Sequence, residues 1–200
     1  MDVQHFNFIA ETVFAPIYPV IADDILARTG IKHGTCIDLG TGTGKLGLAV
    51  ADLNKDMDIV LYDILPEILA LAEKNIGNRE RVTTMKGAVE KLPFADDSID
   101  LAVSRGSVYF WEDKVQAFRE IYRVLKTGGY AYIGGGFGTA ALKKEIEEKM
   151  KTAEPDWIES KRKRNAAYTP DYFKDVLETA GIPHVEIVKE EAGLWILFQK

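Results

Sequence analysis

The sequence predicts an α/β protein with a doubly wound, mostly parallel, Rossmann-like sheet of seven strands and a C-terminal antiparallel hairpin. Short apolar runs of strand type alternate with amphipathic helical patterns through the middle of the 200-residue chain. This alternation is typical of a parallel sheet with helices on both faces. The last two strand patterns are joined by 190–193, a connection so short that the two strands can pair only in the antiparallel sense.

The elements follow from the spacing of apolar residues along the chain. Pro66 is expected to open one helix, and Gly128-Gly129 is expected to end another that begins near Trp111. The expected strands are 35–39, 58–62, 81–86, 99–104, 130–134, 185–189 and 194–199. The expected helices follow the glycine-rich turn through residue 53, open at Pro66, and cover 111–125, 142–151 and 170–180.

The length suits one domain over 1–200, and four segments are expected within it. They are an N-terminal helical cover at 2–29, a ligand-binding core at 35–135, a lid at 137–168, and a terminal helix and hairpin at 169–200. The lid is expected to consist of a polar helix followed by a loop that holds Trp157 and the basic run 161–164.

Composition narrows the classes of protein. Apolar residues make up 46% and charged residues 28% of the chain, with a formal net charge of −6, which argues against a broad nucleic-acid-binding surface. The one cysteine, Cys36, falls in an apolar strand, so a buried thiol is expected rather than a disulfide. Without a signal-peptide pattern or a membrane-spanning run, we expect a cytoplasmic protein. No grouping of residues has the spacing of a metal site.

The glycine-rich turn after the first strand is the strongest indication of a ligand. Asp38 closes the strand, and Gly40, Gly42 and Gly44 follow at alternate positions. Glycine tolerates positive φ and lets a ligand lie directly on the backbone, while the next helix directs free N–H groups to the same place. This order predicts a pocket for an adenosine-bearing ligand.

A second motif overlaps this turn. The stretch 42–47 satisfies the dinucleotide pattern Gly-x-Gly-x-x-Gly, although it starts two residues late relative to the strand end. A nicotinamide-dependent oxidoreductase is therefore one alternative function. A Walker phosphate loop is excluded, because Leu39 and Leu46 stand where it needs a glycine and a hydroxyl.

Ligands in open α/β sheets bind beyond the carboxyl ends of the strands, near the switch in strand order. After the second strand, Asp63 is suited to hold the two hydroxyls of a ribose, and Ile64 offers an apolar face to a base. The third and fourth strands are followed by 87–90 and 104–107, which should reach the same edge of the sheet.

These stretches resemble the class I S-adenosylmethionine-dependent methyltransferases, and among them the small ubiquinone- and menaquinone-biosynthesis type. The matching motifs lie at 37–44, 61–64, 90–101 and 118–129. The resemblance covers about 35–135 and implies direct displacement of a methyl group onto a small organic molecule, with no metal. A methyltransferase-like protein that binds the cofactor without transfer is the other alternative. The acceptor atom and the oligomeric state stay open.

The resemblance also implies residue roles. The methionine and ribose portions of S-adenosylmethionine would contact Asp38, Gly40, Thr41, Gly42 and Thr43. The ribose hydroxyls would be held by Asp63, and the adenine would contact Ile64, Ala88 and Val89. Ser104 would lie near the methionine portion and the sulfonium. At Ala88 the chain departs from the family, which usually has Asp or Asn there to accept the adenine amino group.

Aromatic residues outside the core motifs predict a substrate pocket. The expected lining is His5, Phe6, Phe14, Tyr18, Arg105, Tyr109, Phe110, Trp111, Phe137 and Trp157. Tyr18 and Arg105 are expected over the cofactor or at an acidic substrate, and Tyr109 and His5 are the candidate bases. The run 161–164 is interpreted as a solvated helix face, although it could also bind a phosphate or carboxylate.

Overall fold

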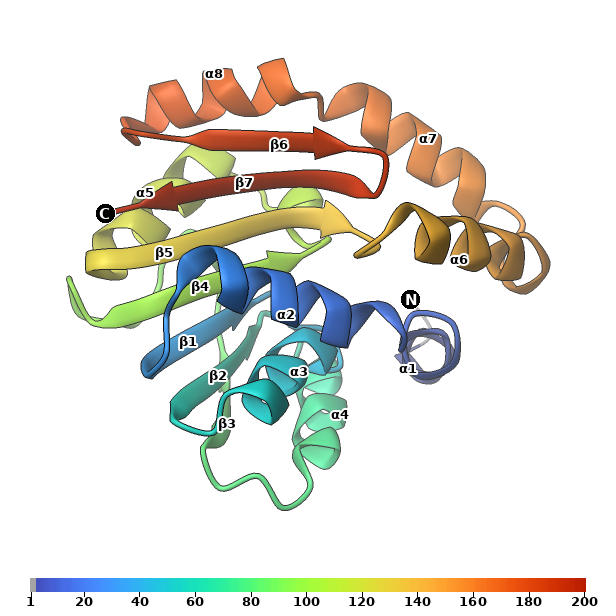
Figure 1. The fold of residues 1–200 in the computed structure, drawn as a ribbon, viewed down its shortest axis with the longest axis horizontal. Coiled ribbons are helices and arrows are strands. Elements are labelled where there is room, and N and C mark those ends of the chain that lie inside the picture. The colour runs from blue at the N-terminus through green and yellow to red at the C-terminus, as the bar shows by residue number, and fades with distance from the viewer. Residues whose placement is uncertain (1–2) are drawn as a thin grey trace.

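A seven-stranded sheet forms the centre of the computed structural model, which describes residues 3–200 (Figure 1). Asp2, the first residue of the expected N-terminal segment, lies outside the described residues. The sheet order is β3-β2-β1-β4-β5-β7-β6. The strands are β1 (Gly34–Leu39), β2 (Met57–Asp63), β3 (Val82–Lys86), β4 (Ile99–Arg105), β5 (Leu125–Gly136), β6 (Glu186–Glu190) and β7 (Gly193–Gln199).

The strand directions confirm the predicted fold class. Strands β1 to β5 pair in parallel, and β7 runs antiparallel to both β5 and β6. The order reverses between β1 and β4, which is the switch point where open α/β sheets bind ligands. A dinucleotide-binding sheet of the order 3-2-1-4-5-6 does not require the antiparallel β7.

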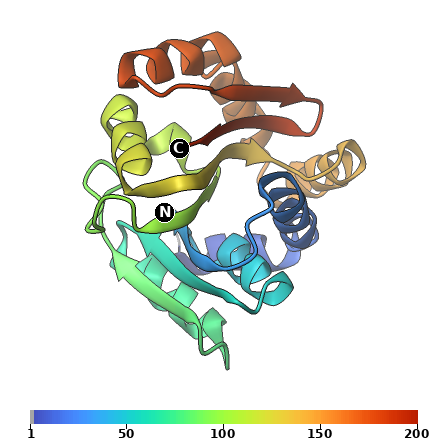
Figure 2. The same cartoon turned by 60° about the vertical axis from the view of Figure 1, so that its left-hand side comes forward.

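Helices cover both faces of the sheet (Figures 1 and 2). Among residues 3–200 they are α1 (Val3–Thr12), α2 (Ile17–Thr29), α3 (Lys45–Leu53), α4 (Pro66–Ile76), α5 (Lys114–Val124), α6 (Ala140–Ala153), α7 (Trp157–Ala167) and α8 (Pro170–Ala180), with a 3₁₀ turn at Val108–Phe110. None of these helices has the length and apolar character that crossing a bilayer requires.

Alternation along the strands creates two cores. Cys36 faces the core under α2 and α3, while its neighbour Ile37 faces the core under α5 and α8. Both side chains are fully buried, as expected for a strand covered on both faces. The thiol of Cys36 is therefore buried as predicted, and burial raises its pKa well above the ordinary value.

Helices that are distant in sequence lie on the side toward which the carboxyl ends of β4 and β5 point. In Figure 1 the arrowheads of β4 and β5 point toward the side where α1, α6 and α7 lie. The N-terminal helix α1 and the helices α6 and α7 between β5 and β6, although distant in sequence, therefore lie on the same side of the sheet.

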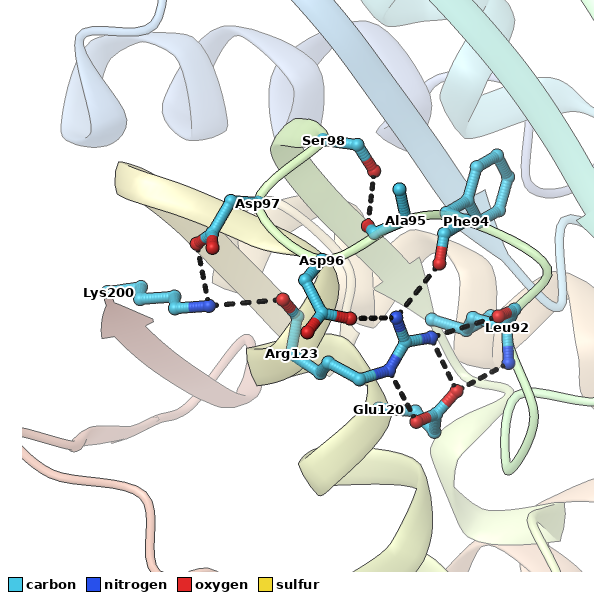
Figure 3. Close-up of polar contacts among 9 residues, drawn as sticks. All are labelled: Leu92, Phe94, Ala95, Asp96, Asp97, Ser98, Glu120, Arg123 and Lys200. Atoms are coloured by element: carbon cyan, nitrogen blue, oxygen red, sulfur yellow. Dashed lines mark hydrogen bonds and ion pairs between the residues drawn. The ribbon is translucent and has the colours of Figure 1, made fainter.

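The connection between β3 and β4, residues 87–98, contains no helix and depends on Arg123 of α5 (Figure 3). The guanidinium donates to the main-chain oxygens of Leu92 and Phe94 at 3.0 and 2.9 Å, and pairs with Glu120 and Asp96. Since a loop without regular structure needs partners for its carbonyls, one arginine provides much of what holds this segment against the sheet.

The prediction that Gly128-Gly129 ends a helix was wrong. Helix α5 ends at Val124, and β5 starts at Leu125 rather than at residue 130. The two glycines instead lie in β5 where its pairing with β4 is irregular, between the pair Ile99 and Leu125 and the pair Leu101 and Tyr130. Gly128 has a φ of +85°, and a Cβ on Gly129 would lie 2.9 Å from the main-chain oxygen of Lys126.

Two helix boundaries also differ from the prediction. Trp111 lies before α5, not in it, because Asp113 caps that helix by accepting from the Gln116 N–H at 2.9 Å. The expected loop after α6 contains α7. This helix lacks an apolar stripe, so the spacing of apolar residues did not predict it. It is stabilised instead by the ion pair of Glu159 with Arg162, one turn further along, and by packing of Trp157 against the core.

Candidate functional site

A cavity of about 710 Å³ opens at the carboxyl ends of the parallel strands. Its floor comes from the glycine turn, from Asp63 at the end of β2 and from the ends of β4 and β5. Helices α1 and α7 contribute its upper walls, with Phe6 and Trp157 among the lining side chains. The volume falls in the range of small-molecule sites.

The glycine turn has the predicted backbone. Gly40 and Gly42 have φ values of +63° and +58°, in the left-handed region that favours glycine. A Cβ on Gly40 would lie 2.3 Å from that of Ser107, and one on Gly42 would lie 3.3 Å from the Phe6 ring. The turn therefore presents bare backbone to the cavity.

Asp38 holds the glycine turn and the start of α3 to the end of β1 through two hydrogen bonds. Its Oδ2 accepts from the Thr41 hydroxyl at 2.6 Å and from the Gly47 N–H at 2.9 Å. Burial raises the pKa of this carboxyl to about 6; the two hydrogen bonds oppose the rise, and the negative charge of Asp63 adds to it. Asp38 does not line the cavity.

Asp63, by contrast, reaches the cavity at the end of β2. Its two oxygens accept from the Gly42 and Leu65 N–H groups at 2.9 and 3.0 Å. Each carboxylate oxygen can accept a second bond, so the side chain is fixed yet still able to receive two hydroxyl groups. The neighbouring Ile64 lines the cavity and exposes 57% of its surface, a large apolar side chain without cover.

Residues 87–90 form the next part of the rim. A Cβ on Gly87 would lie 1.9 Å from the Tyr62 hydroxyl, so the loop passes over that ring only because residue 87 is glycine. Tyr62 donates to the Ala88 oxygen at 3.1 Å. Burial, with the charges of Glu90 and Glu120, raises the pKa of Tyr62 to about 12, which keeps this donor protonated.

Ser107 lines the cavity and lies in the stretch 104–107 that was expected at this edge, although no role was predicted for it. Its hydroxyl donates to the Leu39 oxygen at 2.7 Å and accepts from the Trp111 indole at 3.1 Å. Because its one proton goes to Leu39, Ser104 must donate in the 2.6 Å contact between the two serines. The fully buried Ser104 supports Ser107 from outside the cavity lining. The position of Ser107 directly after the fourth strand was the sequence feature that indicated a place at the cavity.

Arg105 is surrounded by aromatic rings. Its guanidinium carbon lies 4.8 Å from the centroid of Phe14, 5.8 Å from that of Tyr18 and 5.6 Å from that of Phe137, while Nε donates to the Gly136 oxygen at 3.1 Å. Burial lowers the pKa of the guanidinium, partly offset by the nearby tyrosines. Ring faces stabilise a cation in this setting.

The two candidate bases occupy different environments. Tyr109 lines the cavity, and burial raises its pKa, so near neutral pH its hydroxyl is a proton donor in hydrogen bonds. His5 does not line the cavity; its Nε2 lies 2.8 Å from the Glu154 carboxylate and links α1 to the end of α6.

The structure divides the predicted residues into two groups. Those that line the cavity are Phe6, Phe14, Tyr18, Gly40, Gly42, Asp63, Ile64, Ala88, Val89, Arg105, Tyr109, Phe110, Trp111, Phe137 and Trp157. Those that do not are His5, Asp38, Thr41, Thr43 and Ser104. Ser107 and Glu90, for which no individual role was predicted, also line the cavity, as do Lys161 and Arg164 of the basic run.

Comparison with known proteins gives the family. Residues 37–133 match the model of a methyltransferase domain. A Methanococcus maripaludis protein, provisionally described as an S-adenosyl-L-methionine-dependent methyltransferase, has a crystal structure with a TM-score of 0.94 and 43% identity over 99% of this chain and 91% of that one. A methyltransferase from Aquifex aeolicus, at 17% identity and a TM-score of 0.71, shares the fold.

Sequence relatives match the core of the chain. The demethylmenaquinone methyltransferase of Chlorobaculum parvum is 38% identical over 104 residues, which are 52% of this chain and 42% of that protein. The arsenite methyltransferase of Halobacterium salinarum is 29% identical over 160 residues, 78% of this chain and 39% of the relative. The chain thus spans less than half the length of these curated relatives.

The fold and the comparisons together define the class: this chain belongs to the class I S-adenosylmethionine-dependent methyltransferases. S-adenosyl-L-methionine is its cofactor. The site fits that molecule, because Asp63 keeps acceptor capacity beside an uncovered Ile64, and the glycine backbone between them and Ser107 is open to the cavity.

Proposed function

We propose that the protein transfers the methyl group of S-adenosyl-L-methionine to a small organic molecule. The observation that carries the proposal is that Asp63, the bare backbone of Gly40 and Gly42, and the aromatic rings around Arg105 all line one cavity. We call the part of the cavity that is walled by these rings the aromatic chamber. When bound, the cofactor would supply a methyl group activated by the positive sulfur: the methyl acceptor would donate an electron pair to the methyl carbon, and sulfur would keep the electron pair of the broken carbon–sulfur bond and become a neutral thioether.

The residues of the chain bind, orient and exclude water. In this proposal Asp63 receives the ribose hydroxyls, Ile64 and Val89 pack on adenine, and Gly40 and Gly42 lie beside the ribose and methionine portions. The rings of Phe14, Phe137 and Trp157 lie 6.0–6.2 Å from one another by centroids and close the chamber where the acceptor would bind. Asp38 and Thr41 support the turn from behind.

Recognition of the adenine amino group calls for an acceptor other than the Ala88 oxygen. That oxygen already accepts from the Tyr62 hydroxyl and from the Lys91 N–H, both at 3.1 Å, which uses both of its lone pairs. Glu90, two residues along, lines the cavity and is held by the Glu112 N–H at 2.9 Å. We assign Glu90 this role within the proposal.

The test is calorimetric titration with S-adenosyl-L-methionine and S-adenosylhomocysteine. Both should bind, and Asp63→Ala should weaken binding by about tenfold or more, the loss of two hydrogen bonds to a charged group. Asp58→Ala is the matched control, since Asp58 lies on the same strand, exposed and paired with Arg81. Equal affinity of the two variants would contradict the proposed cofactor site.

Transfer is tested separately from binding. Protein loaded with methyl-tritiated cofactor and mixed with a small-molecule extract should release label into the acceptor pool. Cofactor binding with no movement of label would favour the alternative of a binding protein without transfer. Saturable binding of reduced nicotinamide cofactor, without binding of S-adenosylhomocysteine, would favour the oxidoreductase alternative.

A further inference from the structure

Helix α7 turns two of its four consecutive basic residues toward the cavity. Trp157, Lys161 and Arg164 have the spacing of one helix face, are partly buried and line the cavity. Arg162 and Lys163 are exposed and pair with Glu159. The prediction that the basic run 161–164 forms a solvated helix face therefore holds for Arg162 and Lys163 only.

The cations that line the cavity differ in how they are neutralised. Lys161 forms an ion pair with Glu147 of α6. Within residues 3–200, neither Arg105 nor Arg164 forms an ion pair with a carboxylate. Arg164 instead lies over the rings of Tyr109 and Phe110, with its guanidinium carbon 5.4 and 6.0 Å from the ring centroids.

Arg105 and Arg164 line the same cavity, and the pKa of Arg105 is lowered chiefly by burial and to a smaller extent by the positive charge of Arg164. Uncompensated cations in a partly buried site are costly unless a counter-charge binds. Ring faces reduce this cost but leave the net charge in place.

The cavity is polarised along the edge of the sheet. The acidic lining residues are Asp63 at the end of β2, Glu90 in the connection after β3, and Glu112, whose main-chain N–H donates to Glu90. The basic residues come from the end of β4 and from α7. The cofactor carries a net charge of +1, from its sulfonium, ammonium and carboxylate, so its binding adds no net negative charge to the cavity.

Resting on the proposed function, we propose that the methyl acceptor is a small oxyanion, a carboxylate or phosphate, whose charged group binds between Arg105 and Arg164. The planar guanidinium groups match both kinds of anion through paired N–H donors. The aromatic walls give the remainder of the molecule an apolar surface. A negative acceptor also compensates the positive charge of the cofactor inside the chamber.

Binding of model oxyanions tests this inference directly. Protein saturated with S-adenosylhomocysteine is titrated with benzoate, with phenyl phosphate and with neutral benzamide, which share one ring. At least one oxyanion should bind about tenfold tighter than benzamide, and the preferred one distinguishes carboxylate from phosphate. Arg164→Gln should remove this preference, and Arg164→Lys should restore part of it.

Arg162→Gln is the matched control on the same helix, because Arg162 exposes 77% of its side chain and points away from the cavity lining. It should leave oxyanion affinity unchanged. Oxyanion binding no tighter than that of benzamide, or binding insensitive to Arg164→Gln, would overturn the inference while S-adenosylhomocysteine still binds. Failure of S-adenosylhomocysteine to bind the unaltered protein would overturn the proposed function and this inference together.

Discussion

The hydroxyl of Ser107 donates to the main-chain oxygen of Leu39 across 2.7 Å and joins the loop after β4 to the end of β1. These strands flank the point where the strand order reverses. The same hydroxyl accepts from the buried Trp111 indole and from Ser104. One side chain thus fixes two sides of the crevice in which the cofactor is proposed to bind.

Replacing Ser107 should therefore affect both stability and ligand binding. Ser107→Ala removes one hydrogen bond from each of Leu39, Ser104 and Trp111, and should lower the free energy of unfolding by about 1–3 kcal/mol. Affinity for S-adenosylhomocysteine should fall as well, because the loop that lines the cavity loses its tether. Urea denaturation and calorimetry measure the two effects.

Ser98 offers the control for that experiment. Its hydroxyl donates to the Ala95 oxygen at 2.6 Å, outside the cavity lining. Ser98→Ala should change the free energy of unfolding by less than about 1 kcal/mol and leave ligand affinity unchanged. Similar effects of the two substitutions would show that Ser107 has no special structural role.

Arg123 should be far more important to stability than an ordinary surface arginine. Arg123→Ala removes donors from two main-chain oxygens and partners from Glu120 and Asp96, and should lower the free energy of unfolding by about 2–3 kcal/mol. Arg123→Lys should recover less than half, since an ammonium cannot reproduce the planar fork. Urea denaturation provides the comparison.

Arg81 is the reference for the arginine series. It pairs with Asp58, and both side chains are more than half exposed. Such pairs contribute about 0–1 kcal/mol, so Arg81→Ala should be nearly neutral. Equal losses in Arg123→Ala and Arg81→Ala would contradict the tethering role inferred for the 87–98 connection.

Asp38 should make stability depend on pH in a recognisable direction. Its pKa is about 6 in the folded chain, above the ordinary 3.8, chiefly because the carboxyl is buried. Between these values the folded protein retains a proton that the unfolded chain has released. The contribution of Asp38 to the free energy of unfolding therefore falls as pH rises from about 4 to about 6.

Asp38→Asn removes this titration and keeps an amide oxygen for the Gly47 N–H. The free energy of unfolding of the unaltered protein, minus that of the variant, should decrease by up to about 3 kcal/mol across the same interval. Urea denaturation at a series of pH values measures it. A difference that stays constant, or that increases with pH, would show that the buried carboxyl does not titrate in this range.

Residues next to one another in sequence were the easiest to predict. The turn Gly40–Gly44 and the aspartates near the ends of β1 and β2 are local features, because glycine conformation and strand termination depend on a few neighbouring residues. The antiparallel hairpin followed from one short connection. Helix α7 could not be found in this way, because the residues that pack inward are two cations and one ring, not an apolar stripe.

Local patterns also misjudged Gly128-Gly129. A pair of glycines after an amphipathic helix is typical of a helix end, and nothing nearby distinguishes that use from an irregular start to a strand. The main-chain oxygens that approach Gly129 include that of Ile99, thirty residues away. The helix end at Val124 was thus decided by pairing between β5 and β4.

The amino-acid sequence by itself determined the α/β fold, the order of its elements and the motif residues of the methyltransferase family, since these arise from short-range periodicity and turn chemistry. Only the tertiary structure decided which side chains share the cavity. It placed Ser107 against Leu39 and Arg164 over the ring of Tyr109, pairs 68 and 55 residues apart in the chain. Contacts over such separations follow from the way strands and helices pack, which no local pattern encodes.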